Sequence, residues 1–225
     1  MKLLNCLIIA MALSACAKGE RGDVGPQGPA TSLPVVDSTD ADIAKVLADE
    51  NAYRLSLGQT VLSQGLSCSV QAVASGQWLS SSSPGYNAGQ GVIVVTGSSY
   101  SFLLTNELNQ PDTSGSLPFQ ILPTALQTMF LNKNLKMVCS GQVVVLETAY
   151  YAFDLNSDDG SILTIDGAQV INNDGNHGMT LRSGTKLLRR GVHTFNIQYA
   201  QTGSGNQGLV LTANGSTIQT RFFAH

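Results

Sequence analysis

The feature that most constrains this chain is a recurring pattern of short apolar runs separated by turn signals, beginning near Cys68. In the run from His193 to Tyr199, apolar and polar residues alternate, which indicates a strand with one buried face. This alternation predicts Phe195 and Ile197 as core residues. An all-β domain is therefore expected, although alternation alone does not separate a sandwich from a barrel. The expected strands are Ser67–Ala74, Gly91–Thr96, Tyr100–Leu104, Val143–Leu146, Tyr150–Leu155, Ser161–Ile165, His193–Tyr199 and Gly208–Ala213.

An acidic turn separates two of these runs. Asp158 and Asp159 follow the run that begins at Tyr150, and Gly160 comes directly after them. Adjacent carboxylates place several oxygen acceptors at one strand end, which suits a hard cation such as calcium better than a proton-transfer reaction. The alternative is an ordinary hairpin turn, because Asp-Gly is also a strong hairpin signal. These residues alone leave both readings open.

A longer ordered set of motifs surrounds this turn. The pieces are Tyr151-x-Phe153, Ser157-Asp158-Asp159-Gly160-Ser161, Ile165-Asp166-Gly167, Val170-Ile171-x-Asn173-Asp174-Gly175-x-His177-Gly178, Leu187-x-x-x-Gly191-x-His193, Tyr199 and Gly203-Ser204-Gly205. Together they resemble the protective-antigen-type (PA-fourteen) domain, a lectin-like module of bacterial toxins, glycosidases and yeast adhesins. The resemblance implies an antiparallel β-sandwich, for which we expect residues 60–225. Its first half, up to Cys139, carries no signature residues.

The same resemblance implies a calcium site. In the lectin-type members two adjacent aspartates, joined by a cis peptide bond, hold calcium, which in turn receives two sugar hydroxyls. The matching residues here are Asp158 and Asp159. A later loop supplies further oxygens in bacterial members, and its matching residues are Gln201 and Gly203, with Asn206 as a second candidate ligand-binding residue. The alternative is that this glycine-rich loop only turns the chain.

The sequence argues against catalysis. Neighbouring residues on a strand project to opposite sides, whereas glycoside hydrolysis needs two carboxyls that face one bond. His177 falls in a turn motif, where a hydrogen-bonding role explains its presence without catalysis. His193 lies at the start of a strand, and we expect it to be an edge or core residue whose ring nitrogens have hydrogen-bond partners. Glycosidases that contain this type of domain use it beside a separate catalytic domain, for which no room remains here. We therefore expect a protein that is not an enzyme.

The N-terminal residues predict export and lipidation. Residues 1–15 have the basic start, short apolar run and small-residue end of a secretory signal. Leu13-Ser14-Ala15-Cys16 resembles the bacterial lipobox, which implies cleavage before Cys16 and acylation of that residue. Ala17 then points toward the outer membrane in the Gram-negative lipoprotein family. The alternative is a secreted protein in which Cys16 is incidental.

Residues 16–39 are expected to form a tether, and residues 40–58 a short helix. Four triplets with glycine first occupy residues 19–30, a collagen-like pattern that could seed a homotrimer or act as an extended spacer. The helical pattern carries Ile43, Val46, Leu47, Ala48, Tyr53 and Leu55 as its apolar members. One short helix does not distinguish a trimeric coiled coil from a helix packed on its own domain.

Cysteine usage and charge add two expectations. After removal of Cys6 with the signal and acylation of Cys16, Cys68 and Cys139 remain as a pair, and a disulfide is the default in an oxidising compartment. The chain has 12 Lys and Arg against 15 Asp and Glu, and a formal charge of −3. No basic patch of the kind that nucleic acid requires is present.

These observations predict a lipid-anchored protein of the bacterial outer membrane or cell surface that binds glycans through calcium, for adhesion or glycan recognition. The first alternative is a non-catalytic structural or protein-binding surface module without sugar binding, which the collagen-like segment and helix could assemble into a trimer. A carbohydrate-active enzyme is a more remote one.

Overall fold

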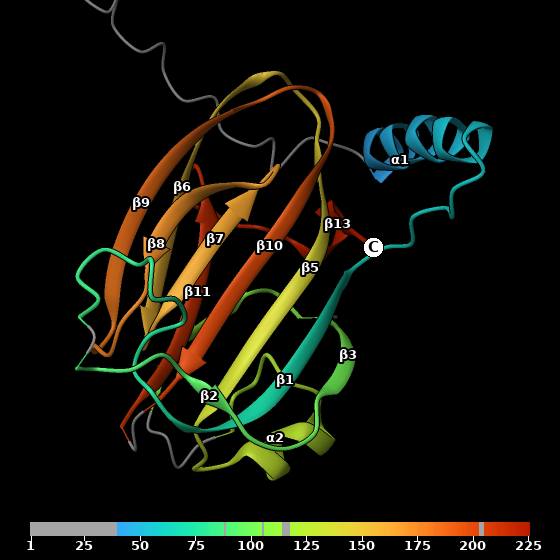
Figure 1. Ribbon diagram of the computed structural model, residues 1–225. Helices are drawn as coiled ribbons and strands as arrows, with labels where there is room; N and C mark the ends of the chain where they lie inside the picture. The colour runs from blue at the N-terminus through green and yellow to red at the C-terminus, as the bar shows by residue number, and fades with distance from the viewer. Residues whose placement is uncertain (1–39, 88, 105, 114–117, 203–204) are drawn as a thin grey trace, which may run out of the picture.

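The computed structural model describes residues 40–87, 89–104, 106–113, 118–202 and 205–225 (Figure 1). The expected signal peptide, Cys16, the collagen-like tether and Gly203 lie outside these residues. Within the described part of the chain, no helix has the length and apolar character needed to cross a membrane.

The described chain is a two-sheet β-sandwich with one helix at its side. Its helices are α1 (Asp40–Ser56), α2 (Thr124–Phe130) and the 3-10 helix η1 (Thr220–Phe222). Its strands are β1 (Leu66–Ser75), β2 (Val94–Val95), β3 (Tyr100–Leu104), β4 (Asn109–Thr113), β5 (Leu135–Val145), β6 (Ala149–Asp158), β7 (Ser161–Ile165), β8 (Ala168–Asn173), β9 (Thr180–Leu188), β10 (Gly191–Gln201), β11 (Gln207–Ala213), β12 (Ser216–Thr217) and β13 (Phe223–Ala224).

All pairings between these strands are antiparallel. One sheet has the order β2-β1-β5-β10-β7-β8, with β3 also beside β1 and β13 beside β5. The other has the order β12-β11-β6-β9, with β4 also beside β11. The predicted all-β antiparallel sandwich is therefore confirmed.

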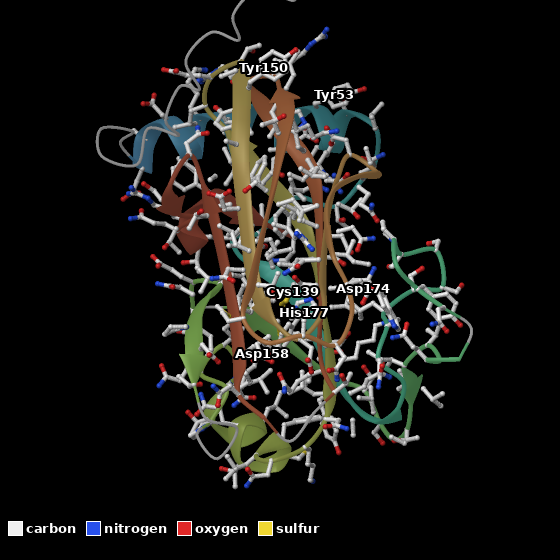
Figure 2. The ribbon with its side chains drawn as sticks, turned by 90° about the vertical axis from the view of Figure 1, so that its left-hand side faces the viewer. Tyr53, Cys139, Tyr150, Asp158, Asp174 and His177 are labelled. Atoms are coloured by element: carbon white, nitrogen blue, oxygen red, sulfur yellow. A yellow bond between two sulfur atoms is a disulfide. The ribbon has the colours of Figure 1, made fainter. Side chains whose placement is uncertain are left out.

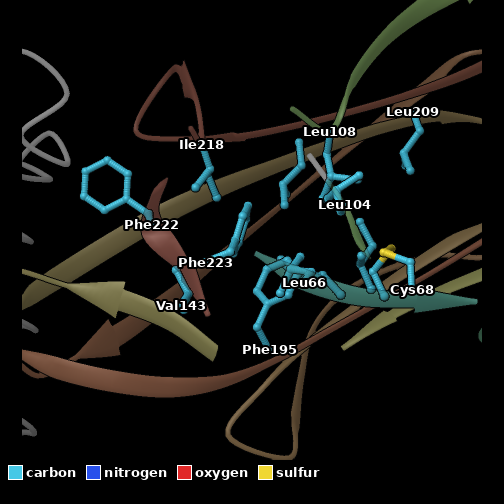
Figure 3. Close-up of a cluster of buried hydrophobic side chains, with 14 of the residues drawn as sticks. Leu66, Cys68, Leu104, Leu108, Val143, Phe195, Leu209, Ile218, Phe222 and Phe223 are labelled. Carbon is cyan, nitrogen blue, oxygen red and sulfur yellow. A yellow bond between two sulfur atoms is a disulfide. The ribbon is translucent and has the colours of Figure 1, made fainter. Parts of the chain in front are cut away.

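The core lies between the two sheets. Along β10, Phe195 and Ile197 are buried, as the alternation of this strand predicted, and Tyr199 is buried as well. Figure 3 shows Phe195 from one sheet and Leu209 from the other within one cluster of buried side chains. Burial of apolar area at about 25 cal/mol per Å² is the main source of stability for such a layer.

The predicted disulfide is present in this core. Cys68 on β1 and Cys139 on β5 are direct cross-strand partners, and their sulfur atoms are bonded. Both residues are buried. The bond links β1, which belongs to the half of the domain without signature residues, to the central strand β5.

The helix predicted at residues 40–58 is found as α1. It lies beside the sandwich (Figure 1). It packs on its own domain, against β10, β5 and η1, and its buried residues are Ile43 and Val46. Arg221 in η1 pairs with Asp40 at 2.9 Å. The other apolar residues of the predicted helix are less buried than these two, and Tyr53 is 61% exposed.

The ends of four strands meet at the opposite end of the sandwich from α1. Asp158 at the end of β6 pairs with Gly208 of β11, and Ser161 at the start of β7 pairs with Tyr199 near the end of β10. Figure 2 shows this separation, with Asp158 far from Tyr53 on α1. The strand order therefore collects the acidic turn and the loop after β10 at one end of the domain.

Candidate functional site

The acidic turn lies between β6 and β7. Asp158 is the last residue of β6, and Asp159 and Gly160 form the connection to β7. The peptide bond between Asp158 and Asp159 is cis, as the family resemblance implied. Both side chains are buried, with 8% and 4% of their residue surfaces exposed. The two aspartates are therefore buried at this end of the sandwich, whereas those of an ordinary hairpin turn would be exposed to solvent.

The Asp159 carboxylate is fixed by two neighbouring loops. Its Oδ1 accepts a hydrogen bond from the His177 backbone N–H at 3.1 Å. Its Oδ2 accepts from the Thr202 backbone N–H at 2.8 Å and from the Thr202 hydroxyl at 3.1 Å. Because a carboxylate offers about four lone-pair sites, these donors leave room for a further partner on Oδ1.

The Asp158 carboxylate has a different environment. Its pKa is raised from 3.8 to about 6, first by burial and then by the charges of Asp159 and Asp112. His177 and a hydrogen bond from the backbone of Met179 oppose this rise. None of the ion pairs among the described residues includes one of these three aspartates. Negative charge therefore accumulates at this end of the sandwich, where His177 is the basic side chain that partly offsets it and no ion pair of the described residues neutralises it.

The Tyr199 hydroxyl contacts the backbone of the acidic turn. Its hydroxyl lies 2.5 Å from the Asp158 carbonyl oxygen and 3.0 Å from Gln201 Oε1, so either oxygen can accept its proton. Burial, and then the nearby Asp159 and Asp158 charges, hold the pKa of Tyr199 well above 10. The hydroxyl therefore stays protonated and serves as a donor to the site.

The other predicted ligands lie on the loop between β10 and β11. Gln201 is buried, and its Nε2 donates to the Asn206 carbonyl oxygen at 2.8 Å, which fixes the shape of the loop. Gln201 contacts the backbone of Asn206, whereas the Asn206 side chain donates from Nδ2 to Asp112 Oδ2 at 3.2 Å. Gly203 lies outside the described residues. The structure thus brings Gln201 and Asn206 to the Asp158–Asp159 end.

Asp112 is the acidic residue of this site that the sequence analysis missed. It lies on β4, which pairs with β11 so that Thr113 is opposite Gln207. No motif surrounds Asp112, and only the pairing of β4 with β11 brings it near Asp158. The hydrogen bond that joins Asp112 to Asn206 spans 94 positions of the sequence.

The two histidines have structural hydrogen bonds. The ring nitrogens of His177 lie 3.0 Å from the Gly178 carbonyl oxygen and 2.9 Å from the Asn173 carbonyl oxygen, which agrees with the expected hydrogen-bonding role. His193 lies at the other end of the sandwich, 2.7 Å from Asp166. His193 therefore takes no part in the acidic site.

The donor set decides which ion this end could hold. Within the described residues, no three His, Cys, Asp or Glu side chains are grouped as a metal site. A cation held by Asp158 and Asp159 would need amide, carbonyl, hydroxyl or water oxygens as its other ligands, and calcium accepts such a mixed oxygen set. The absence of nearby thiolate or paired imidazole ligands in this part of the chain disfavours a zinc-type site.

Comparison with known proteins agrees with the fold. The family model described as the PA14 domain matches residues 128–221, a range that contains the Tyr151–Asn214 segment on which the resemblance rests. A search of curated proteins gave no significant match.

Three solved structures are similar to this chain at low sequence identity. The PA14 domain of the antifreeze protein MpAFP is similar at 15% identity and a TM-score of 0.50, covering 72% of this chain and 91% of that one. The PA14 sugar-binding domain from an RTX adhesin has 18% identity and a TM-score of 0.49, with 72% and 98% covered. The Epithelial Adhesin 9 A domain from Candida glabrata, in complex with Galb1-4GlcNAc, has 16% identity and a TM-score of 0.46, with 70% and 85% covered.

Proposed function

We propose that this domain binds carbohydrate through a calcium ion held by Asp158 and Asp159. The observation that carries the proposal is the burial of these two adjacent carboxylates with no basic side chain paired to them in the described part of the chain. Buried charges are normally paired or coordinate a metal. The match of residues 128–221 to the PA14 domain supports the same assignment.

The two aspartates would have different roles in calcium binding. Asp159 is fixed by donors from His177 and Thr202, so its free lone pair has a set direction. Asp158 supplies a buried carboxylate whose pKa is raised by burial and by the nearby charges of Asp159 and Asp112, so a cation would relieve this repulsion. Gln201 and Asn206 are the proposed further oxygen ligands from the loop after β10. When bound, calcium would use its remaining coordination positions for water or for two neighbouring sugar hydroxyls.

The domain's orientation fits a surface-anchored protein. The acidic site lies at the opposite end of the sandwich from α1, the first element of the described chain, as the positions of Asp158 and Tyr53 show (Figure 2). If Cys16 is acylated as its motif predicts, the tether would hold the α1 end toward the membrane and present the acidic end outward. Localisation to the outer membrane or cell surface, and a role in adhesion, are parts of this proposal.

A structural or protein-binding module is the second candidate. Tyr53, Leu55 and Leu57 at the end of α1 are 61%, 61% and 54% exposed, so this end of the helix carries apolar surface beyond what packs on the sandwich. Together with the glycine triplets upstream, this surface favours self-association, including the homotrimer. In that case the acidic turn would serve only the architecture.

Calcium titration calorimetry on residues 17–225 tests the proposal. Wild type is compared with the double variant Asp158→Ala/Asp159→Ala, and with Asp154→Ala as a control from the same strand, whose carboxylate bonds to Ser183 instead. We expect binding in wild type and in the control, and none in the double variant. A glycan array with calcium and with chelator follows. Equal glycan signals in both conditions, or no calcium binding by wild type, would remove the proposed mechanism.

A further inference from the structure

Asp174 is a third buried carboxylate, separate from the acidic pair. It lies in the turn between β8 and β9 and is 9% exposed. Its Oδ1 accepts from the Leu79 backbone N–H at 2.7 Å and from the Gly175 backbone N–H at 2.9 Å. Its Oδ2 accepts from the Ser80 backbone N–H at 3.0 Å and from the Ser83 hydroxyl at 2.6 Å. Its acceptor sites are filled by neutral donors, so it has no capacity left for a cation.

These donors come from two distant parts of the sequence. Leu79, Ser80 and Ser83 belong to the loop after β1, which lies beside Asp174 in Figure 2, whereas Gly175 belongs to the turn itself. Trp78 reinforces the contact, because a Cβ atom on Gly175 would lie 3.3 Å from its ring. Asp174 therefore ties the loop and the turn together at one buried point.

The turn that contains Asp174 also forms a hydrogen bond with the acidic pair. The His177 backbone N–H, three residues after Asp174, donates to Asp159 Oδ1 at 3.1 Å. Gly160, the residue after Asp159, passes so close that a Cβ atom there would lie 2.8 Å from Asp174 Oδ1 and 3.0 Å from the Gly175 nitrogen. Asp174 thus contacts the backbone on both sides of the site: the turn that donates to Asp159, and the chain that leaves it.

We propose that Asp174 is a positioning residue for the calcium and carbohydrate site, acting through the His177 turn on the Asp159 carboxylate. The inference rests on the proposed function. Groups that orient metal ligands without touching the metal commonly change affinity 10- to 100-fold when they are replaced. Loss of the Asp174 contacts would release the turn, and the His177 N–H would no longer aim at Asp159. The loop after β1 would be coupled to ligand binding through this one carboxylate.

Asp174→Asn tests this coupling, because it keeps the side-chain shape but places an amide N–H₂ group against N–H donors. Asp166→Asn is the matched control. Asp166 also joins two segments, accepting from the Thr194 backbone N–H at 3.1 Å and lying 2.7 Å from His193, but at the far end of the sandwich. Two quantities are measured on residues 17–225: the calcium Kd by calorimetry, and the hydrogen-exchange rate of the His177 amide by NMR in chelator.

We expect Asp174→Asn to raise the calcium Kd about tenfold or more and to speed exchange of the His177 amide, whereas Asp166→Asn changes neither more than about twofold. If Asp174→Asn does not fold, Ser83→Ala removes a single donor and should shift both quantities in the same direction, by about threefold. Unchanged His177 exchange in both site variants would overturn the proposal. If wild type binds no calcium, the proposed function fails, and the exchange rate alone still decides whether Asp174 positions the turn.

Discussion

Asp158→Asn should change stability in opposite directions with and without calcium. In chelator, the Asp158 carboxylate is buried beside Asp159 and near Asp112, and its pKa is raised to about 6. The substitution keeps the side-chain shape and removes the charge. The chelated variant should therefore be more stable than wild type at pH 7.5. With calcium the order should reverse, because only wild type gains the free energy of ligand binding.

The magnitude follows from the pKa shift. Because the folded state binds the Asp158 proton more tightly than the unfolded chain does, the stabilisation from this group is fully present below about pH 3.8 and is lost as the pH rises through about 6. The full shift corresponds to about 3 kcal/mol above pH 7, and solvent screening brings the expected value to about 1–3 kcal/mol. Calcium at one thousand times its Kd would add about 4.1 kcal/mol to wild type, which exceeds this deficit and reverses the order.

Urea unfolding at pH 5 and pH 7.5, each with chelator and with calcium, measures these differences. In chelator, wild type should lose stability between pH 5 and pH 7.5, and Asp158→Asn should lose less. Asp154→Asn, on the same strand, serves as the control and should keep the wild-type pH dependence. The reasoning would be refuted if Asp158→Asn were less stable than wild type in chelator at pH 7.5, since burial of an unbalanced charge could not then be the main effect at this position.

Three further changes test the scaffold and the site. Replacing Cys68 and Cys139 by Ser should lower the free energy of unfolding by about 4 kcal/mol, because the disulfide closes a loop of 71 residues, and reducing-agent controls on wild type should reproduce the loss. Phe195→Ala should cost about 3–5 kcal/mol, because this ring is 2% exposed in the core, while a variant that stays folded keeps its calcium Kd. Asp112→Asn should lower the pKa of Asp158, because the Asp112 charge helps to raise it, and NMR titration of the Asp158 carboxyl in chelator would show a value unchanged from wild type if the two groups were not coupled.

The predictability of each strand depended on how it is buried. Ser161–Ile165 was predicted with its observed bounds, because it is apolar and bordered by turn residues. β9 (Thr180–Leu188) was missed, since most of its residues are exposed or half-buried and its sequence does not alternate between apolar and polar residues. β4 (Asn109–Thr113) was missed for a related reason: it contains Pro111 and no large apolar residue. Proline is tolerated on edge strands, where one row of N–H groups has no partner.

The sequence predicted the site residues that are close together along the chain and missed those that come from distant segments. Asp158 and Asp159 are adjacent in the sequence, so their proximity needed no knowledge of the fold. Asp112 reaches them only through the pairing of β4 with β11, which the sequence pattern does not encode. Asp174 was visible as part of a motif, but its role was not, because its partners at Leu79 and Ser80 lie more than ninety residues earlier. Long-range hydrogen bonds of this kind leave no periodic signal.

The two neighbouring aspartates are unequal, and this inequality bears on how the site would work. Asp159 accepts three hydrogen bonds from His177 and Thr202, so its orientation is set before any ligand arrives. Asp158 instead has a raised pKa, because it is buried and lies near the charges of Asp159 and Asp112. A fixed acceptor beside an unbalanced one is an arrangement that favours a divalent cation over a proton at neutral pH, because the cation can satisfy both carboxylates at once.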